Sequence, residues 1–302
     1  MKYYLNQANY YDFLKKTCYT VLFPMAFACT QKNLSYKSSI DQPEAPEGYE
    51  LVWHDEFNLT GKPDSEFWSY EEGFVRNFEL QYYQAKNANI KKGRLVIEGK
   101  REKVKNREYD PEIKNWRKNE PFAKYSSASI HTKGKKAFTY GIFEVRARID
   151  TAMGMWPAIW TLGETQPWPD NGEIDIMEFY RIDGKATILA NAAWVGENNK
   201  TKYDDAKIPL SHFLEKDPDW SDKYHVWKME WTEEYIRLYL DEELLNEINL
   251  EKTVNPDGFN PLQNPHYILL NLAIGAAGGD PSKTKFPKKY EVDYVRVFQK
   301  ID

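Results

Sequence analysis

The stretch NGEIDIMEFY, residues 171–180, carries three carboxylates within six positions, at Glu173, Asp175 and Glu178. Its alternating apolar residues predict a β-strand. Residues two apart on a strand share a face, so Glu173 and Asp175 point the same way, whereas Glu178 should point to the opposite side. One extra residue at positions 176–177, a β-bulge, would return Glu178 to the face of the other acids. Three acids on one strand face repel one another, which indicates a functional rather than a structural role.

The chain after residue 49 contains many other short segments rich in β-branched and aromatic residues, most of them alternating with polar ones. This pattern predicts an all-β fold, an antiparallel β-sandwich whose concave sheet can hold an extended ligand. A hairpin turn is expected near 241–242 and a single helical turn over 208–213. The expected strands are 51–57, 94–100, 126–132, 140–149, 156–162, 172–179, 187–194, 225–231, 235–240, 267–274 and 290–298.

Composition excludes several classes of protein. The 302 residues include 10 Trp and 21 Tyr, more than a core requires, and such an aromatic excess is common where a cleft stacks on flat ligands. The net charge of −5 and the absence of a basic block argue against a nucleic-acid partner. No cysteine follows Cys29 and the five histidines are scattered, so neither a cysteine nucleophile nor a zinc centre is expected in the folded part.

The first 28 residues have the features of a signal peptide. A basic segment ends at Lys15 and Lys16, and twelve mostly apolar residues follow, which are too few to span a bilayer. Ala26 and Ala28 precede Cys29, which resembles the lipobox of bacterial lipoproteins, although Leu is usual where Ala26 stands. The resemblance predicts lipidation of Cys29 and export to the cell envelope, in the periplasm or on the outer-membrane surface. Ordinary cleavage after Ala28 and a buried N-terminal helix are the alternatives.

Three segments therefore divide the chain. Residues 1–28 are the expected lipoprotein-type signal peptide. Residues 29–48 are polar, contain two prolines and predict a flexible tether. Residues 49–302 are the expected catalytic domain, with no second linker and no internal repeat.

Paired carboxylic acids on one face can cleave a glycosidic bond. A strand rise of ~3.3 Å puts the Cα atoms of Glu173 and Asp175 ~7 Å apart, and that of Glu178 ~13 Å from Glu173. Side chains leaning inward over that span could approach the ~5–5.5 Å carboxyl separation of a retaining enzyme. An ionised Glu173 would raise the pKa of Glu178 and keep it protonated as the acid.

The segment EIDIME resembles the catalytic signature of glycoside hydrolase family 16, in the laminarinase-like branch with the bulged E-x-D-x-x-E strand. By that resemblance Glu173 is the nucleophile, Asp175 the assisting acid and Glu178 the acid/base, and the fold is a concanavalin A-like β-jelly roll. The likeness covers residues 49–299. Further segments resemble family landmarks in the expected order: WHDEF (53–57), RNFELQYYQ (76–84), GRLVIEG (93–99), SSASIHT (126–132), YGIFEVRARI (140–149), GMWPAIWTLG (154–163), NLAIG (271–275) and YEVDYVRVF (290–298).

Several residues outside the catalytic strand are candidates for binding substrate. Asn77 and Glu79 match family positions that bind sugar on the non-reducing side, or they merely order a loop. Trp156 matches a cleft tryptophan, whereas Trp160 could equally belong to the core. Arg76 offers a fork of donors for hydroxyl groups. Two more tryptophans flank the catalytic strand in sequence and could each provide a stacking platform: Trp168 and Trp194.

The family resemblance also implies a structural calcium ion on the convex side. Glu56, the carbonyl of Gly93 and Asp293 match the positions that bind it, and oxygen ligands suit Ca²⁺. The alternative is that Glu56 and Asp293 are simply surface acids. No cofactor is expected for catalysis.

The leading interpretation is an endo-acting, retaining β-glycan hydrolase that acts on β-1,3- or mixed-linkage glucan. An endo-β-galactosidase acting on β-galactan or host O-glycans is the alternative, because ILANAAWVG (188–196) and GAAGGDPS (275–282) depart from the laminarinase pattern at the cleft rim. A non-catalytic carbohydrate-binding module and a transglycosylase are more remote. The expected partners are a polysaccharide or oligosaccharide substrate and, through the lipid anchor only, a membrane. A monomer is expected.

Overall fold

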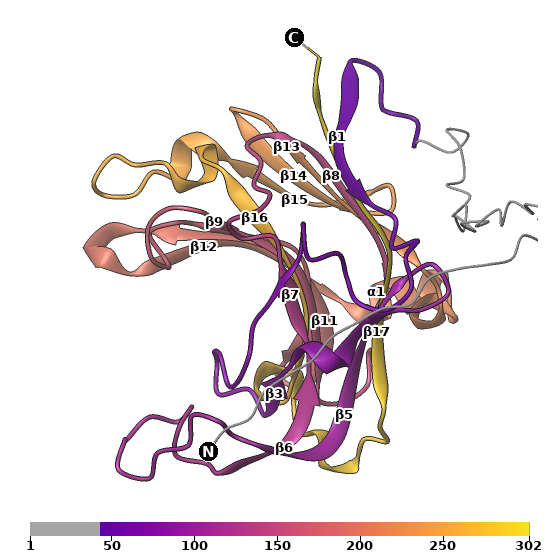
Figure 1. The fold of residues 1–302 in the computed structure, drawn as a ribbon. Coiled ribbons are helices and arrows are strands. Elements are labelled where there is room, and N and C mark those ends of the chain that lie inside the picture. Colours follow the sequence, from indigo (N-terminus) through magenta and orange to yellow (C-terminus); the bar gives the residue numbers. More distant parts are fainter. Residues whose placement is uncertain (1–42, 302) are drawn as a thin grey trace, which may run out of the picture. The chain divides into compact units, whose positions relative to one another are not determined.

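A computed structural model describes residues 43–301. The expected signal peptide, the lipidation site Cys29 and the first part of the tether lie outside the described residues. The described part folds into two facing sheets, and Figure 1 shows their curvature. Within residues 43–301, no helix has the length and apolar character needed to cross a membrane.

The sheet that carries the three acids has seven strands, and every neighbouring pair is antiparallel. NGEIDIMEFY lies near its centre, in β10. The strand order is β12 (Thr201–Pro209), β11 (Lys185–Val195), β10 (Glu173–Ile182), β9 (Met155–Gly163), β16 (His266–Ile274), β7 (Ser129–His131) and β2 (Ser69–Tyr70).

The second sheet has ten strands, and only β3 and β6 pair in parallel. Its main path runs β15 (Glu243–Asn249), β14 (Tyr235–Leu240), β13 (His225–Trp231), β8 (Gly141–Arg148), β17 (Lys288–Lys300), β5 (Leu95–Lys105), β6 (Phe122–Ser127) and β3 (Gln81–Tyr83). Off this path, β1 (Tyr49–Asp55) pairs with β17 and β4 (Ala88–Ile90) with β5. The predicted antiparallel β-sandwich is confirmed.

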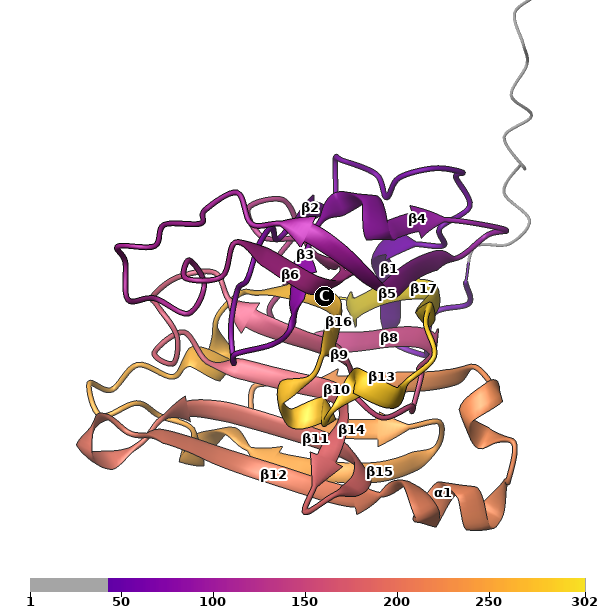
Figure 2. The ribbon, with the colours of Figure 1, turned by 90° about the horizontal axis from the view of Figure 1, so that it is seen from below.

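Helices are short and lie between strands. The α-helix α1 (Leu210–Lys216) follows β12, close to the expected turn over 208–213. It closes the end of the sandwich where β12 and β15, the edge strands of the two sheets, lie next to each other (Figure 2). The 3₁₀ turns are Ala85–Asn87, Glu197–Asn199, Trp220–Asp222, Leu250–Lys252, Pro261–Gln263, Ala276–Gly278 and Pro281–Lys283.

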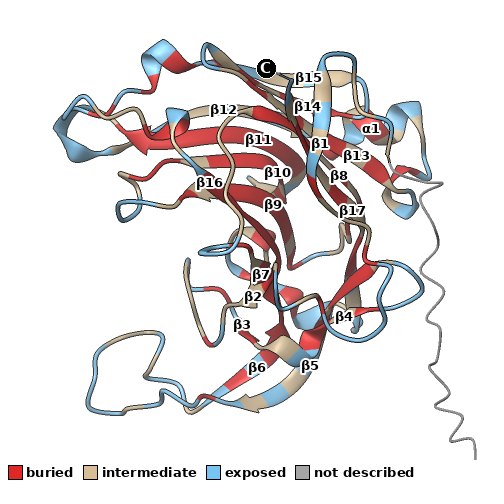
Figure 3. Ribbon diagram, turned by 45° about the horizontal axis from the view of Figure 1, so that its top comes forward, coloured by how far each residue is buried: buried red, intermediate tan, exposed pale blue. Residues whose placement is uncertain are grey.

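The core fills the space between the two sheets and follows the alternation of the strands. In β13, Trp227, Met229 and Trp231 are buried, whereas the residues between them are partly exposed. Figure 3 shows that burial extends along the central strands of both sheets. Burying each large apolar side chain stabilises the fold by roughly 1.5–3 kcal/mol. The core therefore fixes which face of β10 points outward.

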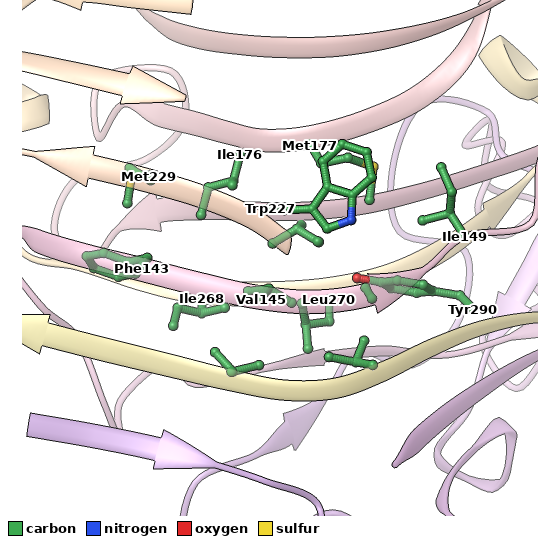
Figure 4. Close-up of a cluster of buried hydrophobic side chains, with 14 of the residues drawn as sticks. Phe143, Val145, Ile149, Ile176, Met177, Trp227, Met229, Ile268, Leu270 and Tyr290 are labelled. Atoms are coloured by element: carbon green, nitrogen blue, oxygen red, sulfur yellow. The ribbon is translucent and has the colours of Figure 1, made fainter. Parts of the chain in front are cut away.

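The predicted bulge in β10 is present. Against β11 the register slips between Asp175 and Glu178, and against β9 it slips between Asp175 and Met177. Ile176 and Met177, although consecutive, both point into the core between the sheets (Figure 4). Glu178 consequently returns to the face of Glu173 and Asp175.

The strand β12 was not among the expected strands, and two of the expected strands differ clearly from the structure. The single strand expected over 126–132 is two strands, β6 and β7, which belong to different sheets. The strand expected over 94–100 continues to Lys105 and forms a projecting hairpin with β6. We call residues 106–121, which join β5 to β6, the arm loop.

Candidate active site

The three acids of β10 lie on the concave face in three successive rows of side chains. Opposite residues in antiparallel strands share a face, so each acid has one neighbour on β11 and one on β9. Glu173 lies between Ala193 and Leu162, Asp175 between Asn191 and Trp160, and Glu178 between Leu189 and Ala158. The acids are thus surrounded by small, apolar or amide side chains, and neighbouring strands add no direct counter-charge.

These rows form the floor of a cavity of about 590 Å³. It contains all three acids and six of the seven residues predicted to bind substrate: Arg76, Asn77, Glu79, Trp156, Trp160 and Trp168. The remaining lining residues are Ala158, Leu162, Tyr180, Asn191, Tyr203, Asp205, Lys207, Asn271 and Ala277. A cavity of this size with aromatic walls suits several sugar units.

Each glutamate accepts a hydrogen bond from one indole. Trp156 Nε1 donates to Glu178 Oε1 at 2.9 Å, and Trp168 Nε1 donates to Glu173 Oε2 at 2.9 Å. Trp168 is 50% exposed, so its ring forms part of the cavity rim. The two tryptophans therefore orient the carboxylates as well as offering apolar surface to a ligand.

Burial dominates the ionisation of the three acids. Burial and the charge of Glu173 together raise the pKa of Glu178 to about 8, against the opposing hydrogen bond from Trp156. Burial raises the pKa of Glu173 to about 7, while the Trp168 hydrogen bond and the charge of Arg76 act to lower it. Burial and the charges of both glutamates raise the pKa of Asp175 well above its usual value. Glu178 thus holds its proton more firmly than Glu173, as an acid/base and a nucleophile require.

Arg76 is held over the cavity wall by a buried network. It pairs with Glu71, which also accepts a hydrogen bond from Ser129 Oγ at 2.6 Å. Its guanidinium lies 4.9 Å from the centre of the Trp160 ring. Its Nη1 atom is buried and has no hydrogen-bond partner within residues 43–301, so one donor remains for a ligand hydroxyl.

Asn77 and Glu79 lie on the same wall. Glu79 is buried and accepts a hydrogen bond from Gln81 Nε2 at 2.6 Å. Gln81 Oε1 in turn accepts from the backbone N–H of Ile274 at 2.7 Å, which ties this wall to β16. Asn77 is exposed and has φ of +56°, a left-handed conformation that asparagine tolerates better than most residues.

Trp160 lies in the cavity floor rather than in the main core. Its Nε1 donates to Asn271 Oδ1 at 2.7 Å, and Asn271 Nδ2 donates to the hydroxyl of Tyr83 at 3.1 Å. Only 7% of its surface is exposed. The residue is therefore a rigid support for Arg76 and for the middle of the cavity.

Trp194 does not line the cavity, and its prediction as a stacking platform is wrong. It is 3% exposed and belongs to the core between the sheets. The reason is the alternation of β11: Asn191 faces the cavity, so Trp194, three positions later, points to the opposite face.

Sequence reasoning missed the far side of the cavity, which is formed by β11 and β12. Tyr203, Asp205 and Lys207 project from alternate positions of β12, and Asp205 pairs with Lys207 at 2.6 Å. The alternation of these residues in TKYDDAKIP could have indicated a strand. The segment was not predicted as one because it contains few apolar residues. Asn191 could have been found from its place opposite Asp175.

Two of the three residues predicted to bind calcium, Glu56 and Asp293, form ion pairs with arginines. Glu56 accepts two hydrogen bonds of 2.8 Å from Arg296, and Asp293 pairs with Arg146 at 2.5 Å. Both carboxylates are therefore neutralised by guanidinium groups. The described part of the chain also contains no group of three or more His, Cys, Asp or Glu side chains suited to a metal ion. This arrangement does not support the calcium prediction.

Comparisons with known proteins agree with the geometry. The sequence profile of Glycosyl hydrolases family 16 matches residues 80–296. A β-glucanase of Rhodothermus marinus is 34% identical over 282 residues, which are 87% of this chain and 89% of the relative. Two solved structures are similar. One comes from work on endo-acting O-glycanases with which members of the human gut microbiota initiate mucin breakdown. It has a TM-score of 0.77 and 33% sequence identity, and the match covers 85% of this chain and 92% of that one. The other, the laminarinase catalytic domain of Thermotoga maritima, has a TM-score of 0.69 at 30% identity, over 85% and 100%.

Proposed function

Since this chain belongs to glycoside hydrolase family 16 and is a retaining glycoside hydrolase, we propose that it is an endo-acting β-glucanase that cleaves β-1,3- or mixed β-1,3-1,4-linked glucan. The observation that carries the proposal is the placement of Glu173, Asp175 and Glu178 together in one open cavity. The relatives named as a β-glucanase and a laminarinase support the choice of substrate.

The proposed reaction takes two steps. Ionised Glu173 attacks the anomeric carbon while the glycosidic C–O bond breaks, and Glu178 gives its proton to the leaving oxygen. This leaves a glycosyl ester on Glu173. Glu178 then takes a proton from water, the water oxygen bonds to the anomeric carbon, and Glu173 leaves as a carboxylate. Asp175 lies between them, and its pKa is raised by burial and by the charges of both glutamates, so it would serve as the assisting acid that steers the ionisation of Glu173.

Substitution of the two glutamates tests these roles. Glu173→Ala and Glu178→Ala should each abolish hydrolysis with the fold intact, as checked by circular dichroism. Activity above a few per cent of the wild type in either variant would refute the assignment. NMR of the earliest products should show the β-anomer, and an α-anomer would contradict the retaining mechanism.

An endo-β-galactosidase acting on host O-glycans is the second candidate. The O-glycanase structure has the higher TM-score of the two structures compared, 0.77 against 0.69. The ILANAAWVG segment that departs from the laminarinase pattern forms β11, so Leu189, Asn191 and Ala193 lie in the cavity rows beside the acids. The departure thus falls where a sugar hydroxyl would be recognised.

A panel of polysaccharides separates the two substrates. Laminarin, lichenan, agarose, keratan sulfate and mucin O-glycans would each be incubated with the protein and the products identified by mass spectrometry. The glucanase proposal expects products from laminarin or lichenan. Products from mucin O-glycans or keratan sulfate alone would contradict it and favour the second candidate.

The N-terminal segment adds a proposal about location. The apolar stretch followed by Cys29 supports a lipid anchor on the bacterial cell envelope, where the enzyme would act as a monomer on polymer outside the cytoplasm. Metabolic labelling with a fatty-acid analogue should mark the wild-type protein and leave Cys29→Ser unlabelled. Equal labelling of both would contradict acylation at this residue.

A further inference from the structure

The arm loop is held in shape by hydrogen bonds between its own residues. The side-chain amide of Asn106 donates to the carbonyl oxygens of Arg117 and Glu120 at 2.8 and 3.0 Å, and the backbone N–H of Asp110 donates to the carbonyl of Lys118 at 2.9 Å. The loop projects from the sandwich and is mostly exposed (Figure 3).

Trp116 of this loop docks on the segment that forms the cavity wall. Its ring lies 5.0 Å from that of Phe78, tilted by 33°, and 6.0 Å from that of Phe74. Beside it, Arg117 Nε donates to the carbonyl oxygen of Val75 at 2.7 Å, and the Arg117 guanidinium lies 5.1 Å from the centre of the Trp116 ring. The arm loop is thus attached immediately next to Asn77, a residue of the cavity.

Phe78 is unusual both in exposure and in backbone conformation. Its side chain is 69% exposed although Trp116 supports it. Its φ is +55° and that of Asn77 is +56°, so two successive residues with a Cβ adopt the left-handed region. Such a conformation is uncommon for a bulky residue and costs on the order of 1–2 kcal/mol. Asn77 lines the cavity, whereas the next residue, Phe78, is mostly exposed and lies outside the lining.

A purely structural role explains this pair poorly. A hydrophobic contact that fastened the arm loop would bury both rings, whereas most of Phe78 remains in water. Leu80, on the same segment, is also 42% exposed. An exposed apolar surface next to a ligand cavity is characteristic of a binding surface.

We propose that Phe78 and Trp116 form an outer sugar-binding platform, which contacts a unit of the glycan beyond those held in the cavity. The proposal rests on the proposed function, since it requires a polymeric substrate. Asn77 joins the platform to the cavity. A glycan that leaves the cavity past Asn77 would therefore meet Phe78 next. The C–H face of a pyranose ring packs on an aromatic face, which carries partial negative charge.

The test is the dependence of kcat/KM on chain length. Oligosaccharides from tetrasaccharide to decasaccharide would be prepared from the polysaccharide that the panel identifies. Phe78→Ala should lower the ratio of kcat/KM for the longest to that for the shortest by roughly three- to tenfold, the effect of losing one aromatic contact. Trp116→Ala should act in the same direction, and Trp116→Phe should restore most of the loss.

Phe122→Ala is the matched control. Phe122 is an aromatic of β6 that is 43% exposed, but its ring lies against Lys103 and not against the segment that carries Asn77. The Phe122→Ala variant should have the same ratio of kcat/KM for the longest to the shortest oligosaccharide as the wild type. Equal ratios in Phe78→Ala and wild type, or equal losses in Phe78→Ala and Phe122→Ala, would overturn the platform.

Binding separates failure of the platform from failure of the proposed function. Affinity electrophoresis in gels that contain each polysaccharide would compare Glu173→Gln with Glu173→Gln/Phe78→Ala. If no polymer is hydrolysed by the wild type, the proposed function falls, yet weaker retention of the double variant would still support the platform. If Phe78→Ala instead converts a dimer to a monomer in sedimentation, the patch binds a second copy and the platform is wrong.

Discussion

Glu173 and Glu178 share one strand, one cavity and the same type of hydrogen-bond donor, but they differ in neighbouring charge. Arg76 acts on Glu173 and lowers its pKa, whereas Glu178 feels the negative charges of Glu173 and Glu79. Burial is the largest cause of both raised pKa values, and the neighbouring charges act on the two acids in opposite directions. At the scale of single residues, an arginine outside the catalytic strand contributes to the division of labour between the two acids.

Arg76→Met should therefore move the acid limb of the kcat/KM–pH profile upward. Removal of the guanidinium removes an interaction that favours ionised Glu173, so a higher pH is needed to form the nucleophile. The alkaline limb, which reports deprotonation of Glu178, should move less. Arg76→Lys keeps the charge and should leave the acid limb near its wild-type position. An unmoved limb in Arg76→Met would contradict this account.

Glu178→Gln should stabilise the protein at neutral and alkaline pH. The pKa of Glu178 is about 8 in the folded state against 4.5 as an ordinary value, so the unfolded chain releases a proton that the folded chain keeps. The free energy of unfolding consequently falls by about 1.4 kcal/mol per pH unit between these values. Glutamine does not titrate, so the variant does not lose this stability as the pH rises. The free energy of unfolding of Glu178→Gln should exceed that of the wild type by little near pH 4.5 and by most near pH 8.

Urea denaturation at both pH values measures this difference. Glu215→Gln, at an exposed acid of α1, controls for the loss of one surface charge. A stability gain in Glu178→Gln that does not grow with pH would show that packing, and not ionisation, is responsible.

At the scale of elements, the bulge of β10 joins the core to the cavity. Ile176 and Met177 both fill the core, and this is possible only because the strand has one residue more than its neighbours there. If the strand kept all its residues but ran without the bulge, every later side chain of β10 would turn over. The bulge therefore connects the packing of the sandwich with the position of the acid/base.

Insertion of one alanine between Met177 and Glu178 should abolish hydrolysis and destabilise the fold, because the single bulge no longer brings Glu178 to the face of the other acids. Glu178 would point into the apolar core, and burying an unpaired carboxylate costs several kcal/mol. Met177→Ala is the companion variant: it should lose about 2–5 kcal/mol of stability through a cavity but keep Glu178 in place and retain hydrolysis. Hydrolysis assays and urea denaturation check both, and an active insertion variant would contradict the role given to the bulge.

The sequence predicted elements well where burial alternates and poorly where both faces are polar. The broken spacing of the acids predicted the bulge, and HVWKMEW predicted β13. The strand β12 was missed because its exposed edge carries charged residues in place of apolar ones. Trp194 was wrongly predicted to line the cleft because it is aromatic, although its spacing of three residues from Asn191 on one strand places it on the opposite face. The arm loop brings Trp116 to Phe78 across 38 positions of sequence, and no local pattern reports such a contact.

At the scale of the whole molecule, the ion pairs near β1 and β17 bear on the calcium prediction. Glu56 and Asp293 are each paired with an arginine. Chelation with EGTA should therefore leave the melting temperature within about 1 °C of its value in calcium, because a cation that binds only the folded state would raise it. Magnesium serves as the control ion. A rise of several degrees in the melting temperature with calcium, but not with magnesium, would support the calcium site.

The pairing of β1 with β17 has a further consequence for the whole molecule. Tyr49 lies opposite Lys300, and the backbone N–H of Ile301 donates to the carbonyl of Gly48 at 3.0 Å. The two ends of the sandwich thus meet on one strand pair. A short linker could join them, so circular permutants reopened at the β14–β15 turn should preserve the fold, and a fused partner could be placed at either end with the same orientation to the cleft.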